Sequence, residues 1–453
     1  MIKIHIKNTS LKFSFLVGIM FMLNSCDKLV DIPAPSYVLN NGDVFADSTT
    51  TMSAVAALYG SMLTGSNLSY TGQLYALSGV YADELTNIVY PEYQNNALSP
   101  SDISVRALWV DSYKFIYQAN SVIEQAGNSK GISTGVKNRA IGEAKFIRAF
   151  CYFQLINFYN SVPLVLSTNL AETRDLPASP YNVVSQQIVT DLQDASSRLP
   201  ADYAISGNQR VRANKYAANA LLAKMYLYLK DWNNAAAQAT SIISQSAIFN
   251  LESDLNKVFL NNSAEAILQF SNRENGYASI AVYFVPRNGF QPPFIISNAL
   301  WSSFEASDLR KTSWIATSAG LAYPAKYKVT TGATEMDILL RLSDIYLVRA
   351  ESRANLENLS GALEDLNLVR RRAGLQNASA TSKNDILSAI EKERKVELFC
   401  EWNNRLFDLK RTGRIDDVMS IAKPNTWNTN AKLYPIPISE IAANPKLIQN
   451  PGY

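Results

Sequence analysis

Three glutamates at four-residue spacing, Glu393, Glu397 and Glu401, form the group in this chain that is best placed to perform chemistry. Residues four apart on a helix lie on the same face, so these three carboxylates would be neighbours. Two facing carboxylates can hydrolyse a glycosidic bond, one acting as the acid and the other as nucleophile or base. One interpretation of the segment is therefore a glycoside hydrolase that uses Glu393 and Glu401.

A structural interpretation of the same glutamates is favoured by their surroundings. The three glutamates lie on the same predicted helix face as the apolar residues Ile386 and Ile390. Val396, Cys400 and Phe407 lie on a neighbouring face of the same predicted helix. Carboxylates that face a core need cationic partners, and the guanidinium group matches them best. The nearby arginines are Arg370, Arg371, Arg372, Arg394, Arg405, Arg411 and Arg414. We therefore predict a buried ion-pair network here and no catalytic residue.

The N-terminal segment has the composition of a secretory signal. An almost unbroken apolar run from Phe13 to Leu23 follows three positive charges, Lys3, Lys7 and Lys12. About eleven helical residues extend roughly 16 Å against a hydrocarbon core of about 30 Å, so the run is too short for a permanent membrane span. We predict that residues 1–25 are a signal peptide.

Cys26 follows directly, in the stretch "LNSC", which resembles the lipobox of bacterial lipoproteins. In such proteins a signal peptidase cuts before the cysteine, and a lipid is joined to its sulfur. An ordinary signal peptide with a cysteine close by is the alternative. We predict lipidation at Cys26, with the proline-containing residues 26–50 as a tether between the lipid and the folded body.

Removal of residues 1–25 leaves a neutral chain. That segment holds three lysines, no acidic residue and the only histidine, His5, so the 42 Lys and Arg of the full chain fall to 39, equal to the 39 Asp and Glu. A neutral chain gives no reason to expect a nucleic-acid partner. The lack of histidine excludes histidine metal sites and nucleophiles activated by imidazole. We expect no metal and no cofactor besides the lipid anchor.

Helical periodicity dominates the sequence after residue 50. Apolar residues recur at spacings of three and four between residues 140 and 158. Ala223 and Ala235 are twelve apart, as are Ala350 and Ala362, which is typical of the close helix contact in a tetratricopeptide repeat. We predict a mainly α domain over residues 51–453 with tetratricopeptide-like helical pairs at residues 106–160, 213–246 and 336–373.

Two segments interrupt this pattern. Residues 66–104 and 250–335 contain scattered aromatics and turn-forming residues, which predicts irregular structure inserted between helical units. Within the helical segments, four residues read as packing residues, namely Cys151, Cys400, Trp109 and Trp232.

Four stretches, taken together and in order, resemble one known family. They are "CDKLVDIPAP", "GEAKFIRAFCYFQLINFYNSVPLV", "IEKERKVELFCEWNNRLFDLKRTGR" and the C-terminal "LYPIPISEIAANPKLIQNPGY". They are similar to the RagB/SusD family of Bacteroidetes outer-membrane lipoproteins over nearly the whole chain. The resemblance implies a nutrient-binding lipoprotein at the cell surface, built on four tetratricopeptide-like helical pairs, with no enzymatic activity.

The same resemblance implies a partner and a ligand. Members of the family cap a SusC-type TonB-dependent transporter and deliver oligosaccharides, or peptides in some cases, into its barrel. We expect an oligosaccharide ligand, with peptide binding as the alternative within the family. A scaffold that binds only other proteins is a further alternative.

The irregular segments carry residues suited to holding sugars. Neutral sugars present C–H faces that pack on aromatic rings and hydroxyls that need fixed hydrogen-bond partners. Family members bind ligands in such variable segments, to which the insertion at residues 250–335 corresponds. We predict a platform of Tyr70, Tyr90, Tyr93, Tyr277, Tyr283, Trp301 and Trp314, with Asp83, Asn87, Asn95 and Arg287 as hydrogen-bond partners at its edge.

Overall fold

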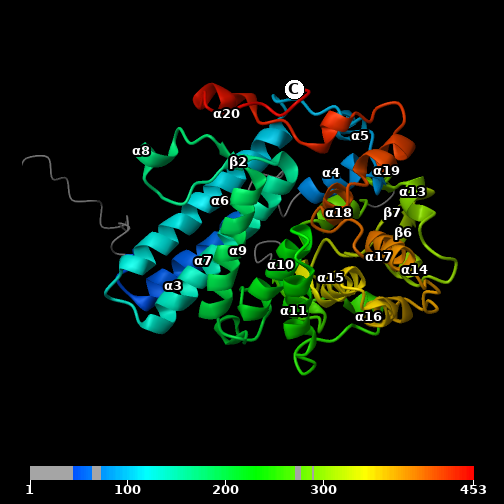
Figure 1. Ribbon diagram of the computed structural model, residues 1–453, viewed down its shortest axis with the longest axis horizontal. Coiled ribbons are helices and arrows are strands. Elements are labelled where there is room, and N and C mark those ends of the chain that lie inside the picture. The colour runs from blue at the N-terminus through cyan, green and yellow to red at the C-terminus, as the bar shows by residue number, and fades with distance from the viewer. Residues whose placement is uncertain (1–43, 64–72, 271–276, 288–289) are drawn as a thin grey trace, which may run out of the picture.

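The computed structural model describes residues 44–63, 73–270, 277–287 and 290–453, and it is mainly helical, as the sequence predicted. The long helices follow one another across Figure 1, from α3, α6 and α7 on the left to α15 and α16 on the right. They are α3 (Ser48–Leu63), α6 (Ile103–Asn128), α7 (Thr134–Tyr159), α9 (Tyr181–Arg198), α10 (Lys215–Tyr228), α11 (Trp232–Ile243), α15 (Leu342–Asn355), α16 (Leu359–Arg372) and α17 (Lys383–Glu397).

Two of the helical pairs show the repeat geometry at the same positions. Ala223 and Ala235 of α10 and α11 are fully buried, as are Ala350 and Ala362 of α15 and α16. Small side chains at these positions let the paired backbones approach closely. The turns correspond as well, because Lys230 and Glu357 both have positive φ and precede the N-caps Asp231 and Asn358, whose side chains accept from backbone N–H groups. The tetratricopeptide-like interpretation of these helices is therefore confirmed.

The pairs join into a continuous row of helices. The pair α6 and α7 continues through α9, which packs on both α7 and α10, and α11 packs on α15. The sequence analysis did not single out α9, although its buried residues Val184, Ile188, Leu192 and Ala195 recur at helical spacings of four, four and three. Gly142 on α7 permits a close approach to α9, since a Cβ there would lie 2.8 Å from Cγ of Leu199. Close packing along the row buries a core to which distant parts of the chain contribute.

Short elements fill the segments between the helices. The small helices are α4 (Leu74–Tyr81), α5 (Pro91–Gln94), α8 (Leu170–Thr173), α12 (Ala281–Phe284), α13 (Asn298–Trp301), α14 (Arg310–Ser313), α18 (Asn404–Arg411), α19 (Ile415–Ala422), α20 (Ile438–Ala443), and the 3-10 turns η1 (Ala204–Ser206), η2 (Leu255–Lys257) and η3 (Thr429–Lys432). The strands form antiparallel pairs: β1 (Leu85–Thr86) with β5 (Ile295–Ile296), β2 (Val162–Pro163) with β3 (Ala178–Ser179), β4 (Ala266–Phe270) with β8 (Asp337–Arg341), and β6 (Ile315–Ser318) with β7 (Leu321–Pro324).

Two boundaries differ from the sequence-based prediction. The tether was drawn to residue 50, but α3 begins at Ser48 and Phe45 is already buried, because its ring joins the core. The third helical pair was expected from residue 336, but residues 337–341 form strand β8, whose pairing with β4 is a distant contact. The fully buried residues of both strands lack the alternation that identifies a strand in sequence.

The helix that carries Glu393 is shorter than predicted. Helix α17 ends at Glu397, and a turn separates it from α18, so Glu401 and Phe407 do not lie on α17. The backbone of Cys400, Trp402 and Asn403 has positive φ, which reverses the chain without glycine. The prediction of one continuous helix through Phe407 is therefore wrong.

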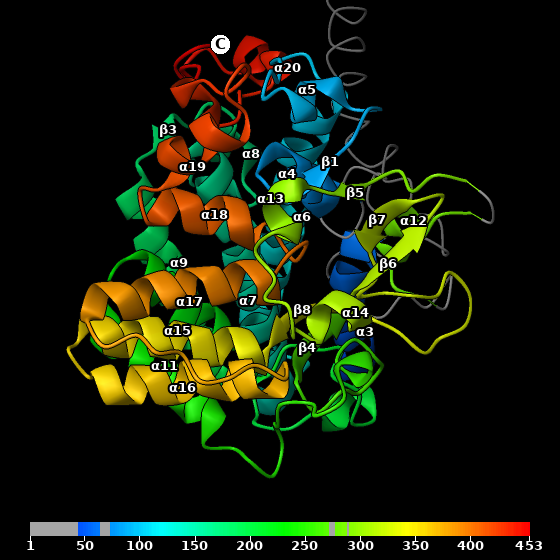
Figure 2. The same ribbon diagram turned by 90° about the vertical axis from the view of Figure 1, so that its right-hand side faces the viewer.

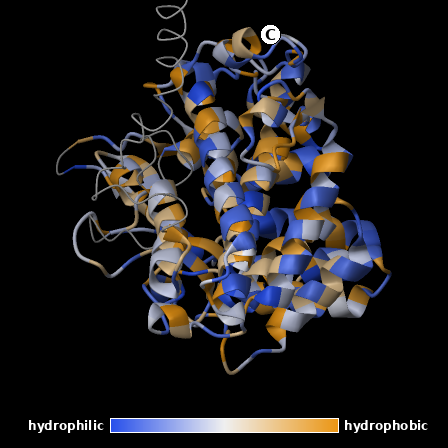
Figure 3. Cartoon of the chain, turned by 90° about the vertical axis from the view of Figure 1, so that its left-hand side faces the viewer, coloured by the Kyte–Doolittle hydropathy of each residue, from blue (hydrophilic) through white to orange (hydrophobic). Residues whose placement is uncertain are grey.

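The predicted packing residues lie in the core. Cys151 and Cys400 are buried free thiols, and Trp109 is 2% exposed with its ring edge-on to Tyr159 at a centroid distance of 4.9 Å. Trp232 is half-buried against the core at the start of α11. Figure 3 shows hydrophobic and hydrophilic residues interspersed along the helices, and in the described part of the chain no helix combines the length and apolarity needed to cross a membrane.

Candidate functional site

A two-residue ladder brings the two irregular segments together. In it, Leu85 pairs with Ile296 and Thr86 with Ile295. Directly after β1, the Asn87 side chain accepts from the backbone N–H of Val89 at 2.6 Å and of Tyr90 at 2.9 Å, and donates to the carbonyl of Pro293. The turn after β1 is thus fixed beside the chain that precedes β5. Figure 2 shows β1, β5, β7 and α12 near one another on its right-hand side.

Tyr90 is held rigidly at this junction. Its ring lies parallel to that of Phe294, with an interplanar angle of 8° and a centroid distance of 6.5 Å, and Phe294 in turn packs edge-on against Phe284 at 5.9 Å. The Tyr90 hydroxyl donates to Oε1 of Gln73 at 3.0 Å. Tyr90 remains half-buried, so part of its ring faces outward on a pre-organised aromatic stack.

Two further tyrosines complete what we call the tyrosine cluster, defined as Tyr90, Tyr277 and Tyr283. Tyr283 lies on α12, and Tyr277 lies four residues before the start of that helix. Both tyrosines are half-buried against the core. Burial raises the pKa of Tyr283, and the neighbouring hydroxyls of Tyr90 and Tyr277 raise it further. Tyr283 therefore lies within electrostatic reach of both other phenolic groups, although Tyr90 comes from a segment nearly 200 residues away in the sequence.

Exposed apolar residues lie on the same segments, and the sequence analysis did not single them out. Phe290 is 69% exposed, and its carbonyl accepts from the Ser318 hydroxyl at the tip of the β6–β7 hairpin, at 3.1 Å. Ile88 and Val89 in the turn after β1 are 90% and 61% exposed. The sequence did offer a signal for these residues, because they are apolar, lie in a loop and follow no helix or strand periodicity. Large apolar side chains in an exposed loop often mark a contact surface.

Asp83 and Asn87 do not lie at a ligand-facing edge, and their assignment there was wrong. Asp83 is 4% exposed, and its carboxylate contacts Arg405 at 2.7 Å and Lys395 at 2.8 Å. Burial alone would raise the pKa of Asp83, but these two cations outweigh it and hold that pKa well below its usual value. Asn87 is 2% exposed, and its amide is occupied by the turn described above.

Tyr93 and Trp314 are also corrected, because both rings are fully buried. Tyr93 packs edge-on against Tyr81 at 6.1 Å and Tyr434 at 6.3 Å. The indole N–H of Trp314 donates to the carbonyl of Leu255 at 3.0 Å. Aromatic residues in a loop anchor that loop when a core lies within reach, and sequence alone does not distinguish anchors from exposed rings.

The remaining candidates keep their status as predictions. Asn95 and Arg287 are exposed, next to α5 and α12 respectively. Trp301 is 41% exposed, but the ammonium of Lys311 lies 4.0 Å above its ring, and no ring contact among the described residues joins it to the tyrosine cluster. Tyr70 and Cys26 lie outside the described residues.

Glu397 lies at the centre of the predicted ion-pair network. Its carboxylate contacts Nη1 of Arg310 at 2.8 Å, Nη1 of Arg341 at 2.5 Å, and Arg372. Burial opposes ionisation, but the three guanidinium groups outweigh it and hold the pKa of Glu397 well below its usual value. The prediction of a buried network of carboxylates and arginines is confirmed.

The two carboxylates of the hydrolase interpretation belong to the same network. Glu393 is 1% exposed and contacts Arg310 at 2.6 Å, while Glu401 is 6% exposed and contacts Arg341 at 2.8 Å and Lys326 at 2.5 Å. A catalytic carboxylate must come within hydrogen-bond distance of its substrate. Glu393 and Glu401 are instead enclosed by cations inside the fold, so the interpretation that uses this pair for hydrolysis is wrong.

Comparisons with known proteins agree over most of the chain. A family model described as "SusD family" matches residues 301–453, and one described as "Starch-binding associating with outer membrane" matches residues 38–227. SusD-like protein P2 of Formosa agariphila is 26% identical over 510 residues, which cover 98% of this chain and 99% of that protein. SusD-like protein P25 of the same organism is 24% identical over 526 residues, which cover 96% of this chain and 98% of that protein.

Solved structures share the fold. A SusD superfamily protein from Bacteroides vulgatus superposes with a TM-score of 0.80 at 21% identity, covering 90% of this chain and all of that one. A structure described as "Laminarin binding SusD-like protein" gives a TM-score of 0.76 at 22% identity, again covering 90% of this chain and all of that one. The sequence matches lie in both halves of the chain, and the helical row agrees with them: the chain belongs to the SusD/RagB family.

Proposed function

We propose that this chain is a non-enzymatic, lipid-anchored binding protein for neutral oligosaccharides, and that the tyrosine cluster is its binding surface. The observation that carries the proposal is the convergence of Tyr90, Tyr277 and Tyr283 from two irregular segments, one of which also carries the exposed ring of Phe290. A relative with the same fold is described as laminarin-binding, and the family model over residues 38–227 is described as starch-binding.

The cluster offers what a sugar needs. Because the Tyr90 ring is already fixed on Phe294, it can receive the C–H face of a pyranose without losing conformational entropy on binding. The phenolic hydroxyls supply hydrogen-bond partners for sugar hydroxyls. Exposed Asn95 and Arg287 stay candidates for further polar contacts at the edge.

The anchor and the partner complete the proposal. The "LNSC" stretch supports a lipid on Cys26 and a location at the outer membrane, in line with the outer-membrane description of the matching family model. We infer delivery of the bound sugar to a SusC-type TonB-dependent transporter from family membership. Peptide binding and a pure protein-interaction scaffold are then outcomes that a ligand screen distinguishes.

The decisive experiment is calorimetric titration of the protein lacking residues 1–26 with laminarin and starch oligosaccharides. Combined Tyr90→Ala and Tyr283→Ala substitution should weaken binding by at least about tenfold, since each stacked ring contributes on the order of 1 kcal/mol. Tyr117→Ala is the matched control, because Tyr117 is a 54% exposed tyrosine on α6. Equal affinity of the double variant and the control would reject the site, and binding of peptides alone would reject the ligand class.

A further inference from the structure

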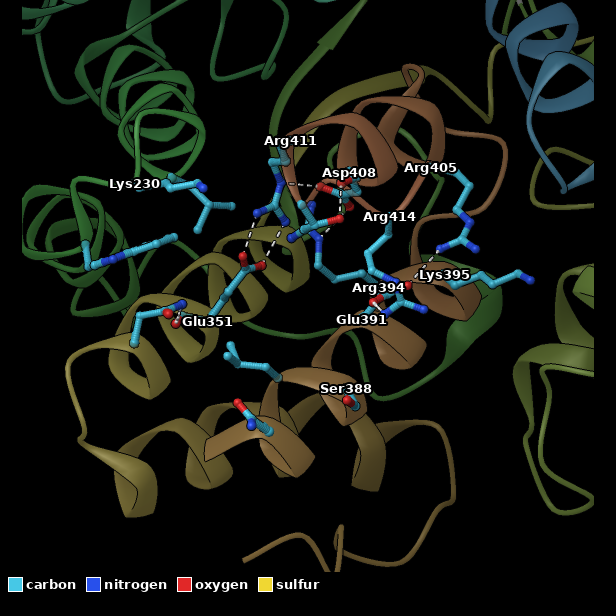
Figure 4. A pocket seen from close by; sticks show the side chains of 16 residues that line it. Lys230, Glu351, Ser388, Glu391, Arg394, Lys395, Arg405, Asp408, Arg411 and Arg414 are labelled. Atoms are coloured by element: carbon cyan, nitrogen blue, oxygen red, sulfur yellow. Dashed lines mark hydrogen bonds and ion pairs between the residues drawn. The ribbon is translucent and has the colours of Figure 1, made fainter. Parts of the chain in front are cut away.

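A cavity lies among the repeat helices. Its volume is about 530 Å³, and its walls come from the α10–α11 turn, α15, α17 and α18. Figure 4 shows Glu351, Arg411 and Asp408 converging at one side of it, while Lys395 extends away from them. In Figure 2, α15 and α16 lie at the lower left while β7 and α12 lie at the right, so this cavity is separate from the tyrosine cluster.

Positive charge dominates the wall of this cavity. Three carboxylates line it, from Glu351, Glu391 and Asp408, and the cations that line it are Lys230, Arg394, Lys395, Arg405, Arg411 and Arg414. Asp83, Asp344 and Asp417, which contact these cations from outside the cavity, offset three of the positive charges, and Lys224 on Asp344 restores one. A positive balance therefore remains around an open space.

Most of these cations form ion pairs with neighbouring carboxylates. Arg411 donates to both oxygens of Glu351 at 2.5 and 2.8 Å and to Asp408 at 2.7 Å. Arg394 donates from Nε to Asp408 at 2.7 Å and from Nη1 to Asp344 at 3.0 Å. Asp408 is thus shared between two arginines, which leaves the site with more donors than acceptors.

One donor enclosed behind the wall has no acceptor within the described part of the chain. The Arg394 side chain is only 3% exposed, and its Nη2 has no hydrogen-bond partner. A buried guanidinium N–H without an acceptor costs free energy, and an anion that reaches it removes this cost. Lys230, exposed in the turn beside the cavity, forms no ion pair with any described carboxylate and adds charge at the rim.

We propose that this cavity binds the carboxylate or sulfate of an acidic saccharide unit, drawn by the positive balance of its wall, with exposed Lys230 as the contact at the rim and the unpartnered Arg394 guanidinium enclosed behind the wall. The volume lies within the range of about 300–1,000 Å³ typical of small-ligand sites. Leu227, Trp232 and Leu387 give the cavity an apolar wall for the body of a sugar ring. The saccharide part of the proposal rests on the proposed function, which assigns neutral units to the tyrosine cluster. The anionic part stands on the charges of this separate wall.

A matched pair of variants tests the site without touching the buried arginines. Ser388 is an exposed residue of α17 at the cavity, labelled in Figure 4. Ser388→Glu places a carboxylate in the cavity, while Ser388→Gln adds the same bulk without charge. The probe is glucuronate, titrated against glucose and against sulfate at constant ionic strength, with circular dichroism to verify the fold of each variant.

We expect saturable glucuronate binding to the unsubstituted protein and to Ser388→Gln, at least about tenfold weaker binding to Ser388→Glu, and several-fold weaker binding to Lys230→Gln. Glucose should not compete. Absence of glucuronate binding, or equal binding to the Glu and Gln variants, overturns the site. Equal affinity for free sulfate and glucuronate overturns the saccharide assignment. The Tyr90→Ala and Tyr283→Ala variant should bind glucuronate normally, which separates failure of this proposal from failure of the tyrosine cluster.

Discussion

The carboxylate of Asp83 accepts hydrogen bonds from Nε and Nη2 of Arg405 at 2.7 and 3.0 Å, a contact between residues 322 positions apart. Asp83 stands two residues before β1, and Arg405 lies on α18, so the pair fixes the start of the segment that carries Tyr90 to the C-terminal part of the fold. The proposed binding surface therefore depends on an internal ion pair that is buried away from it.

Asp83→Asn should destabilise the fold by about 3–5 kcal/mol, because it leaves Arg405 and Lys395 buried without their counter-ion. Since the pKa of Asp83 is lowered in the folded state, its contribution is present above the unfolded pKa of about 3.9 and is lost as the pH falls below it. Urea denaturation at pH 7 measures the loss. Asp417→Asn, at a 77% exposed position, is the control and should change stability by less than about 0.5 kcal/mol.

Glu84→Gln should stabilise the protein increasingly between pH 5 and pH 8. Burial, assisted by neighbouring Asp83, raises the pKa of Glu84 to about 8. Above the unfolded pKa of about 4.3 the unfolded chain is ionised while folded Glu84 stays protonated, so this residue lowers stability as the pH rises to about 8. Glutamine does not titrate, and its carbonyl oxygen can still accept from the N–H of Cys400.

The gap between Glu84→Gln and the unsubstituted protein should reach on the order of 2–4 kcal/mol at pH 8. Denaturation curves at several pH values measure it. Glu364→Gln, whose carboxylate is 72% exposed, should show no such widening. A constant gap for Glu84→Gln across the range would contradict the buried protonated carboxyl.

Gly142→Ala should destabilise the fold by about 1–3 kcal/mol, although alanine is the better helix former. The added Cβ would lie 2.8 and 2.9 Å from Cγ and Cδ2 of buried Leu199, so α7 and α9 would have to separate. Gly60→Ala in α3 is the control, because no described atom lies within 4 Å of the new Cβ, and it should stabilise by about 0.5–1 kcal/mol. Thermal unfolding compares the two, and equal midpoints would show that the helix contact is looser than the structure indicates.

Cys26→Ser should release the protein from the membrane fraction, since the sulfur that we expect to carry the lipid is absent. Fractionation of cells and mass spectrometry of the mature N-terminus measure the result. A variant that stays in the membrane, or an unmodified Cys26 in the native protein, would disprove the anchor.

Incubation with laminarin or starch oligosaccharides should release no shorter products, because Glu393 and Glu401 are enclosed by Arg310, Arg341 and Lys326. Chromatography of the incubated mixture is the measurement. If products do appear, Glu401→Gln shows whether this carboxylate contributes, and a loss of cleavage in that variant would restore the hydrolase interpretation.

The sequence by itself determined the helical pairs and the presence of an ion-pair network around the three glutamates, because both leave local signals. Only the fold showed that Arg310 and Arg341, from distant segments, are among their principal partners. Periodic alanines such as Ala223 and Ala350 mark the helix contacts, and glutamates that continue an apolar helix face near many arginines indicate buried ion pairs. The pair β4 and β8 left no such signal, because both strands are buried along their whole length and their pairing joins distant segments.

Only the tertiary structure decided which loop aromatics face outward. Tyr90 and Tyr93 are three residues apart in the same loop, yet Tyr90 stays half-buried on Phe294 while Tyr93 is sealed between Tyr81 and Tyr434. The exposure of a side chain depends on what the rest of the chain places over it, which no local pattern encodes. The cavity around Arg394 was hidden for the same reason, because its walls come from four elements that meet only in the folded protein.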